Sequence, residues 1–186
     1  MENSFLPPNY EKPALGSKYL KFLAGDNKFR ILSGAIVGYV DWQDLEDGNR
    51  KPIRTKEKPK QSFDPLKPCK HFWTFIVWDY RDEAIKILEI TQVTIQDAIF
   101  NLHSDDNWGD PREYDLNIRK TGNKLETKYT IIPMPPKKLS VEIIKLFKET
   151  NINLEALYSG DDPFNSSVKK IQEEEKEEIS LDEVSF

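Results

Sequence analysis

Two neighbouring stretches of this sequence bring together residue types that bind phosphates and nucleobases. Between Arg50 and Lys70, eight basic residues stand against two acidic ones, which gives a net charge of +6. Immediately afterwards, the stretch KHFWTFIVWDY (70–80) places five aromatic rings within nine residues. Basic side chains neutralise phosphates, while aromatic rings stack on bases of any sequence. An isolated charge run is often only a solvated surface, but beside so many rings it favours binding to a single-stranded nucleic acid.

The candidate phosphate contacts in this region are Arg50, Lys51, Arg54, Lys56, Lys58, Lys60 and Lys70. The candidate stacking residues are Trp42, Phe72, Trp73, Trp78 and Tyr80, which Tyr39, Phe63 and Trp108 could extend. Side chains alternate between the two faces of a strand, so Phe72, Trp78 and Tyr80 share one face. Thr74 belongs to that face, and an apolar core seldom includes a threonine. We therefore expect this face to point outwards, with Trp73 on the opposite face as the alternative.

A group of acidic residues could instead bind metal ions for catalysis. It consists of Asp105, Asp106, Asp110, Glu113 and Asp115. Carboxylates of this kind can position Mg²⁺ ions for a nuclease. However, the neighbouring Gly109 and Pro111 are typical of a turn, and no nucleophile, general base or phosphate-binding loop accompanies them. The sequence therefore predicts a turn here, no enzyme and no cofactor.

Metal and disulfide chemistry are also not indicated. Cys69, His71 and His103 are too few and too scattered for a structural zinc site, which normally has four ligands at paired spacings. The single cysteine excludes an internal disulfide. Because the sequence shows no signal peptide and no long apolar run, we expect a cytoplasmic protein.

The C-terminal end carries the acidity of the chain. From Asp161 to Phe186, nine acidic residues stand against three basic ones, a net charge of -6, whereas the first 160 residues carry +1. Such a run buries too little apolar surface to fold, so residues 161–186 are expected to be a disordered tail. Its end includes Asp182, Glu183 and Phe186. A terminal ring with a free carboxylate can enter an apolar pocket that has a basic rim, which predicts a protein-binding role.

The elements that must position these residues follow from the hydrophobic pattern. Residues 1–24 are proline-rich and read as an extended arm. The segment 27–42 is rich in β-branched and aromatic residues and predicts one long strand that bends at Gly34 and Gly38. The four prolines between residues 50 and 70 predict a long loop.

Two hairpins and two helices complete the expected domain. The hairpins are 70–80 with 84–92 and 112–120 with 124–134, and the helices are 94–104, capped by Thr94, and a short helix capped by Ser140. Five strands with a helix between the third and fourth are typical of an OB-fold, a small, partly open barrel that binds oligonucleotides. We therefore expect a mainly β OB-fold domain over residues 25–160.

Several sequence blocks resemble, in order, those of the single-stranded DNA-binding proteins encoded by tailed bacteriophages. The blocks are NKFRILSGAIVGY, KPIRTKEKP, KHFWTFIVWDY, ILEITQVTIQDAI, WGDPREYDLNIRKTG and TKYTIIPMP, between residues 27 and 136. The resemblance implies an OB-fold protein that coats single-stranded DNA in phage replication, recombination and repair, in the host cytoplasm. It implies DNA contacts at Lys28, Arg30, Arg54, Trp73 and Trp78.

The tail also resembles that of replicative single-strand binding proteins. These proteins commonly end in an acidic segment with a terminal aromatic residue, which recruits replication proteins such as a polymerase, helicase or primase. Here Phe186 fits this pattern, but the proline that precedes the final phenylalanine of the bacterial version is missing. A strand-annealing or RNA-binding module and a noncatalytic protein-interaction adaptor remain the alternative functions.

Overall fold

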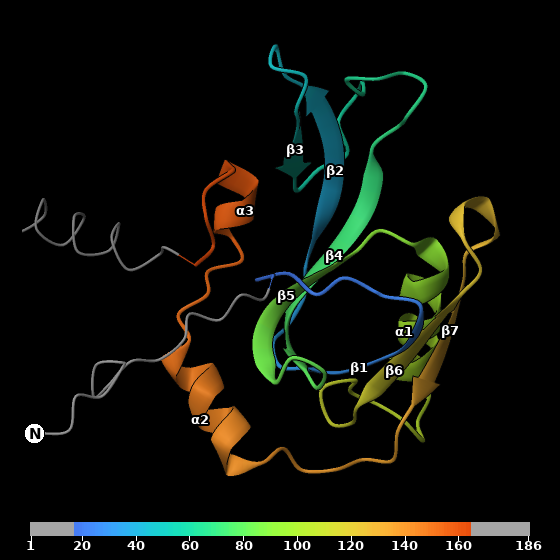
Figure 1. The fold of residues 1–186 in the computed structure, drawn as a ribbon, viewed down its shortest axis with the longest axis vertical. Helices are drawn as coiled ribbons and strands as arrows, with labels where there is room; N and C mark the ends of the chain where they lie inside the picture. The colour runs from blue at the N-terminus through green and yellow to red at the C-terminus, as the bar shows by residue number, and fades with distance from the viewer. Residues whose placement is uncertain (1–16, 165–186) are drawn as a thin grey trace, which may run out of the picture.

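The computed structural model describes residues 17–164, and these form a mainly β structure, as expected (Figure 1). The strands are β1 (Gly25–Ile31), β2 (Ile36–Asp44), β3 (Arg50–Thr55), β4 (Lys70–Asp79), β5 (Ala84–Ile90), β6 (Leu116–Thr121) and β7 (Lys128–Pro133). The helices are α1 (Val93–Ser104), α2 (Val141–Glu149) and α3 (Ala156–Ser159), with a 3-10 turn η1 (Lys124–Glu126). The N-terminal part of the expected arm and most of the expected tail lie outside the described residues.

All seven strands join one antiparallel sheet. Its order is β3-β2-β4-β1-β6-β7, and β5 pairs with the other edge of β4. Ile31 lies opposite Val77 and Ile36 opposite Thr74, so β1 and β2 follow the same edge of β4. Five steps along β1 and β2 match three steps along β4, which leaves two extra residues at the bend. The single bent strand that the sequence predicted is therefore two strands on one path.

The strand β3 corrects the expectation of a loop over residues 50–70. Residues 50–55 pair with β2, and only residues 56–69 form a loop between strands. Pro52 lies opposite Trp42 in this pairing. Among the described strands β3 pairs only with β2, and such an edge strand tolerates a proline because one of its sides has no hydrogen-bonding partner.

The inner face of the sheet, meaning the face that packs against α1, carries the main core. Phe75 and Val77 of β4 meet Leu88 of β5 there, together with Ile95 and Ile99 of α1. Helix α1 begins at Val93 after Gln92, so Thr94 is not its cap, which corrects that expectation. These contacts fix β4 with its odd-numbered side chains facing inwards.

The outer face of β4 and β5 is covered by the C-terminal part of the described chain. Ile76 and Ile87 pack there against Leu154 and Leu157. Helix α2 precedes this segment and begins as predicted, since the Ser140 Oγ accepts a hydrogen bond from the Ile143 N–H at 3.4 Å. The fold therefore places a chain segment over a sheet face that the sequence predicted to be open.

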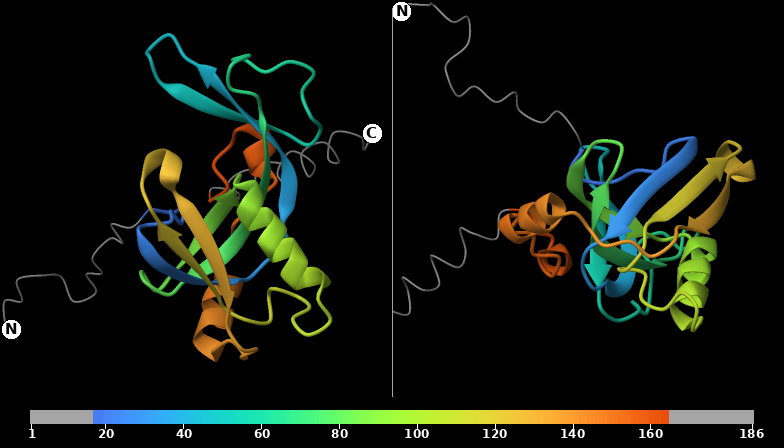
Figure 2. Two further views of the ribbon diagram at one scale, coloured as in Figure 1. Left: turned by 90° about the vertical axis from the view of Figure 1, so that its right-hand side faces the viewer. Right: turned by 90° about the horizontal axis from the view of Figure 1, so that it is seen from below.

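Two hairpins project from the body on the same side (Figure 2). One is β2–β3, which lies beside the loop 56–69, and the other is β6–β7. Within residues 17–164, no helix combines the length and apolar character needed to cross a membrane. The same residues contain no cluster of three or more histidine, cysteine or acidic side chains suited to a metal ion.

Candidate nucleic-acid interface

The eight basic residues between Arg50 and Lys70 divide into two sets of four. The paired set consists of Arg50 with Asp44, Arg54 with Glu89, Lys56 with Glu155, and Lys67 with Asp64. The unpaired set consists of Lys51, Lys58, Lys60 and Lys70, for which no carboxylate within residues 17–164 lies at ion-pair distance. All four unpaired lysines are exposed. Their charges are therefore available to a phosphate backbone.

Arg54 forms the most buried ion pair of the paired set. Its Nε lies 2.7 Å from the Glu89 carboxylate, and both side chains are largely buried. The Thr74 hydroxyl donates to the same carboxylate at 3.4 Å. This pair ties the edge strand β3 to β5 across the outer face, so the structure gives Arg54 a structural role, while its predicted contact with DNA stays a prediction.

The loop 56–69 is held against the hairpin by side-chain hydrogen bonds to its backbone. The buried Asp41 accepts from the backbone N–H of Trp42 at 2.8 Å and of Phe63 at 2.9 Å. The Ser62 hydroxyl accepts from the Cys69 N–H at 2.9 Å. The rings of Trp42 and Phe63 are both exposed. Asp41 therefore fixes the backbone at Trp42 and Phe63, whose rings were predicted to stack on bases.

The prediction that the face of the aromatic strand with Phe72 and Trp78 is open to solvent is wrong. Phe72 is 0% exposed and Trp78 is 8% exposed, because the C-terminal segment covers the outer face. Tyr80 is only partly exposed. In contrast Trp73, the alternative, is partly exposed at the margin of the inner face. Of the phenylalanine and tryptophan rings in this strand, only Trp73 is not buried.

The rings of the inner face that are not buried form a row along β2 and β4. Val37 lies opposite Trp73, and Tyr39 lies opposite His71. The Tyr39 and His71 rings contact each other edge to face, with centroids 5.4 Å apart. This row continues from the buried core onto the projecting hairpin. It provides the extended, partly apolar surface that stacked bases require.

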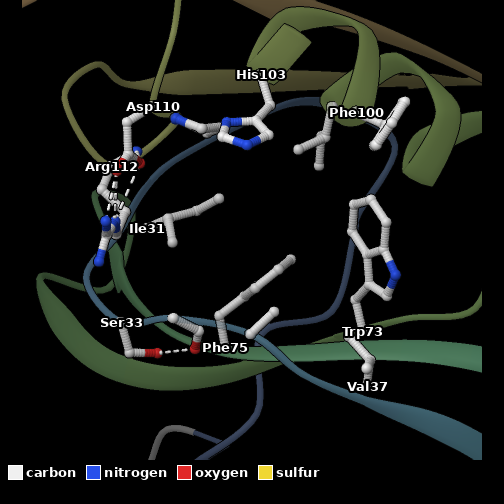
Figure 3. Close-up of a pocket in the computed structure, with 13 residues that line it drawn as sticks. Ile31, Ser33, Val37, Trp73, Phe75, Phe100, His103, Asp110 and Arg112 are labelled. Atoms are coloured by element: carbon white, nitrogen blue, oxygen red, sulfur yellow. Dashed lines mark hydrogen bonds and ion pairs between the residues drawn. The ribbon is translucent and has the colours of Figure 1, made fainter.

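A hollow of about 450 Å³ opens at the end of this row (Figure 3). Trp73, Phe100 and Val37 lie on one side of it, and Asp110 and Arg112 lie on the other. Sequence analysis missed Phe100. Its signal was available, because it falls outside the apolar spacing of α1 and would be expected to point away from the core, and it is 57% exposed.

The polar side of the hollow is a turn. The Asp110 carboxylate accepts from the Arg112 backbone N–H and from the Arg112 Nε, both at 2.9 Å. The Arg112 guanidinium lowers the pKa of Asp110, which keeps this carboxylate charged. Asp105 likewise accepts from the Asn107 N–H at 2.8 Å. These bonds are typical of turn residues, as the sequence predicted.

Arg30 and Lys28 meet at Asp115 on the face of the β1–β6 pair opposite to the core residues Phe29 and Ile31. Arg30 is 2% exposed, and its Nε lies 2.6 Å from the Asp115 carboxylate. The Lys28 Nζ lies 3.0 Å from the same carboxylate and 4.4 Å from the centroid of the Tyr80 ring. The Tyr80 hydroxyl donates to Asp115 at 2.9 Å. Arg30 is therefore structural, whereas Lys28 keeps part of its surface exposed.

The groups around Asp115 determine the pKa of its carboxylate. Burial alone would raise the pKa of Asp115, but Lys28, Tyr80 and Arg30 outweigh it and lower that pKa. Burial and the Asp115 carboxylate raise the pKa of Tyr80 to about 12. The Asp115 carboxylate thus stays charged at neutral pH while the Tyr80 hydroxyl stays protonated, and their contacts link β1 to the ends of β4 and β6.

The predicted partner-binding residues Asp182, Glu183 and Phe186 lie outside the described residues. Their role stays a prediction.

Comparison with known proteins supports the resemblance seen in the sequence. The chain is 27% identical over 140 residues to a probable ssDNA-binding protein of Escherichia phage T5. This match covers 61% of the chain and 54% of the phage protein, so the chain spans about half the length of that relative. No protein-family model matches the chain, and no solved structure does. The predicted resemblance to the single-stranded DNA-binding proteins of phages is therefore confirmed as a distant similarity.

Proposed function

We propose that this protein binds single-stranded DNA without sequence preference and coats it. The observation that carries the proposal is the position of three unpaired lysines on one projecting hairpin and its loop, with a fourth at the start of β4, beside exposed aromatic rings. Cations that follow a backbone and rings that accept any base are the features of sequence-tolerant single-strand binding. The similarity to a probable ssDNA-binding protein of phage T5 supports the same function.

The proposed path of the strand runs along the hairpin and across the inner-face row. Lys51, Lys58 and Lys60 contact phosphates, as does Lys70 at the start of β4. Trp73 and Phe100 receive a base in the hollow that they line, and Tyr39 with His71 supports the next base. The exposed ring of Phe63, whose backbone N–H binds Asp41, extends the row towards the hairpin tip, and the exposed ring of Trp42 on the other face of β2 offers a further contact there.

An OB-fold accounts for this placement. When β1 and β2 count as one bent strand and β3 as an added edge strand, five barrel strands remain, and α1 lies between the third and fourth. The β2–β3 hairpin with its loop then takes the position between barrel strands one and two. The β6–β7 turn takes the position between strands four and five. These are the loops that bind oligonucleotides in OB-folds, and both project from the same side of the body (Figure 2).

The proposed role is noncatalytic. The carboxylates that could have held Mg²⁺ instead bind turn N–H groups, as Asp105 and Asp110 do. We further propose that the protein acts in phage DNA replication, recombination and repair in the host cytoplasm. In this proposal, the acidic end with Phe186 recruits a polymerase, helicase or primase.

A titration with poly(dT) that follows tryptophan fluorescence tests this function. Stacking of Trp73 on a base should quench its emission, and the quenching should weaken with added salt and persist when divalent metals are chelated. A Trp73→Phe variant is the matched control, because it keeps a stacking ring but removes the reporter, so binding should persist while the quenching falls. If poly(dT) neither quenches the fluorescence nor shifts the protein in a gel, the proposal is refuted.

A further inference from the structure

A short closed loop of the C-terminal segment lies on the outer face beside β3 (Figure 1). We call residues 153–163 the α3 strap. The Asn153 N–H donates to the Pro163 carbonyl at 2.9 Å and closes the strap at its base. Leu154 and Leu157 anchor it on the outer face of β4 and β5. The strap is therefore a compact unit that hydrophobic contacts hold from beneath.

The polar side of the strap engages the basic hairpin. The Glu155 carboxylate lies 2.9 Å from the Lys56 Nζ, and this hydrogen bond raises the pKa of Lys56. Both of these side chains are exposed, so the pair is open to exchange with another anion. Gly160 also lies close to the Lys51 side chain, since a Cβ at Gly160 would be 3.7 Å from the Lys51 Nζ.

The aromatic side of the strap covers a ring of β4. The Tyr158 ring centroid lies 6.2 Å from that of Phe72, and the Tyr158 hydroxyl donates to the Val37 carbonyl at 2.7 Å. The Lys56 Nζ also lies 5.0 Å from the Tyr158 ring centroid. The strap is thus joined to the loop 56–69 by the Glu155 carboxylate on Lys56, to β4 by the Tyr158 ring against Phe72, and to β2 by the Tyr158 hydroxyl on the Val37 carbonyl.

These three contacts have the chemistry of a bound nucleotide, with the carboxylate in the place of a phosphate and the ring in the place of a base. We infer that the α3 strap occupies a second single-strand binding surface, formed by Lys56, Phe72 and the Val37 carbonyl, and that a DNA strand displaces Glu155 and Tyr158 from it. This inference rests on the proposed function. It also gives Phe72 and Lys56, both predicted from sequence to bind DNA, a state in which they do so.

Affinity measurements on strap variants of the full chain test the inference. Tyr158→Phe removes only the hydrogen bond to Val37 and keeps the ring, so affinity for poly(dT) should rise by about twofold to tenfold, the range for loss of one competing hydrogen bond. Glu155→Gln should also raise affinity, and its gain should shrink as salt screens the pair. Glu149→Gln is the matched control, because it removes one acid from the neighbouring α2, where Glu149 pairs with Lys145.

A double-mutant cycle provides a second readout. Lys56→Gln should cost little DNA affinity in the natural chain, where Glu155 already neutralises Lys56, but should cost more in the Glu155→Gln background. If both strap variants leave affinity at the level of Glu149→Gln, or if affinity falls because Tyr158 itself binds DNA, the inference is overturned. If the natural chain does not bind poly(dT) at all, the proposed function fails first, and that result is seen before any variant is compared.

Discussion

The division of the basic segment into paired and unpaired residues predicts which charges carry the salt dependence of DNA binding. Each phosphate contact to a single strand contributes about 0.7 to the slope of log affinity against log salt concentration. Replacing the unpaired Lys58 and Lys60 by glutamine should therefore lower this slope by about 1.4. Replacing all four unpaired lysines should lower it by about 2.8.

The matched control removes two paired charges from the same segment. Arg50 lies 2.7 Å from Asp44, and Lys67 lies 3.3 Å from Asp64, with all four residues on the hairpin or its loop. Because these cations are already neutralised, replacing both by glutamine should change the slope much less. Fluorescence titrations with poly(dT) at several salt concentrations measure both slopes. Equal losses in the two double variants would refute the reasoning, because net charge and not pairing would then control the binding.

Further predictions concern the ring in the hollow, the buried cluster, the bend of the hairpin and the tail. Trp73→Ala should weaken binding by about 1 to 3 kcal/mol, measured by poly(dT) titration of variants shown by circular dichroism to be folded. Asp115 has a lowered pKa, so its stabilising contribution is present at neutral pH and is lost as pH falls below its ordinary value of 3.8. Asp115→Asn should lower the unfolding temperature at pH 7 and remove part of the acid sensitivity. Gly38→Ala should destabilise the hairpin, because a Cβ there would lie against the Thr55 carbonyl oxygen, and thermal unfolding measures this loss. Deleting residues 172–186 should tighten DNA binding most at low salt and abolish partner recruitment, whereas Phe186→Ala should affect only recruitment, as measured by pull-down with a replication polymerase.

Local patterns predicted the parts of the fold that local chemistry determines. The runs 70–80 and 84–92 indicated the β4–β5 hairpin, the helical spacing of Ile95, Ile99 and Leu102 indicated α1, and Ser140 marked the start of α2. Gly34 and Gly38 indicated a bend in the first long strand. They did not indicate that this strand is divided into β1 and β2. A proline in β3 hid a strand, because the rule against proline applies to central strands and not to edges.

The orientation of the site depended on contacts that are distant in sequence. Thr74 suggested an open outer face, but its hydroxyl instead meets Glu89, and the α3 strap covers Phe72 from more than 80 residues away. The sequence likewise marked Arg30 as basic without showing that Asp115 and the Lys137 carbonyl surround it. Counting charges predicted a basic surface, whereas only the pairing of each cation shows which charges remain available.

The most direct test of DNA coating is a competition between single-stranded and duplex DNA. A labelled oligo(dT) bound to the full chain is challenged with unlabelled oligo(dT) or with a blunt duplex of the same length, at one salt concentration. Because rings stack only on bases that are not already stacked within a helix, the account predicts that the single strand displaces the label at far lower concentrations than the duplex. Equal displacement by the two competitors would contradict it, since backbone charge alone would then account for the binding.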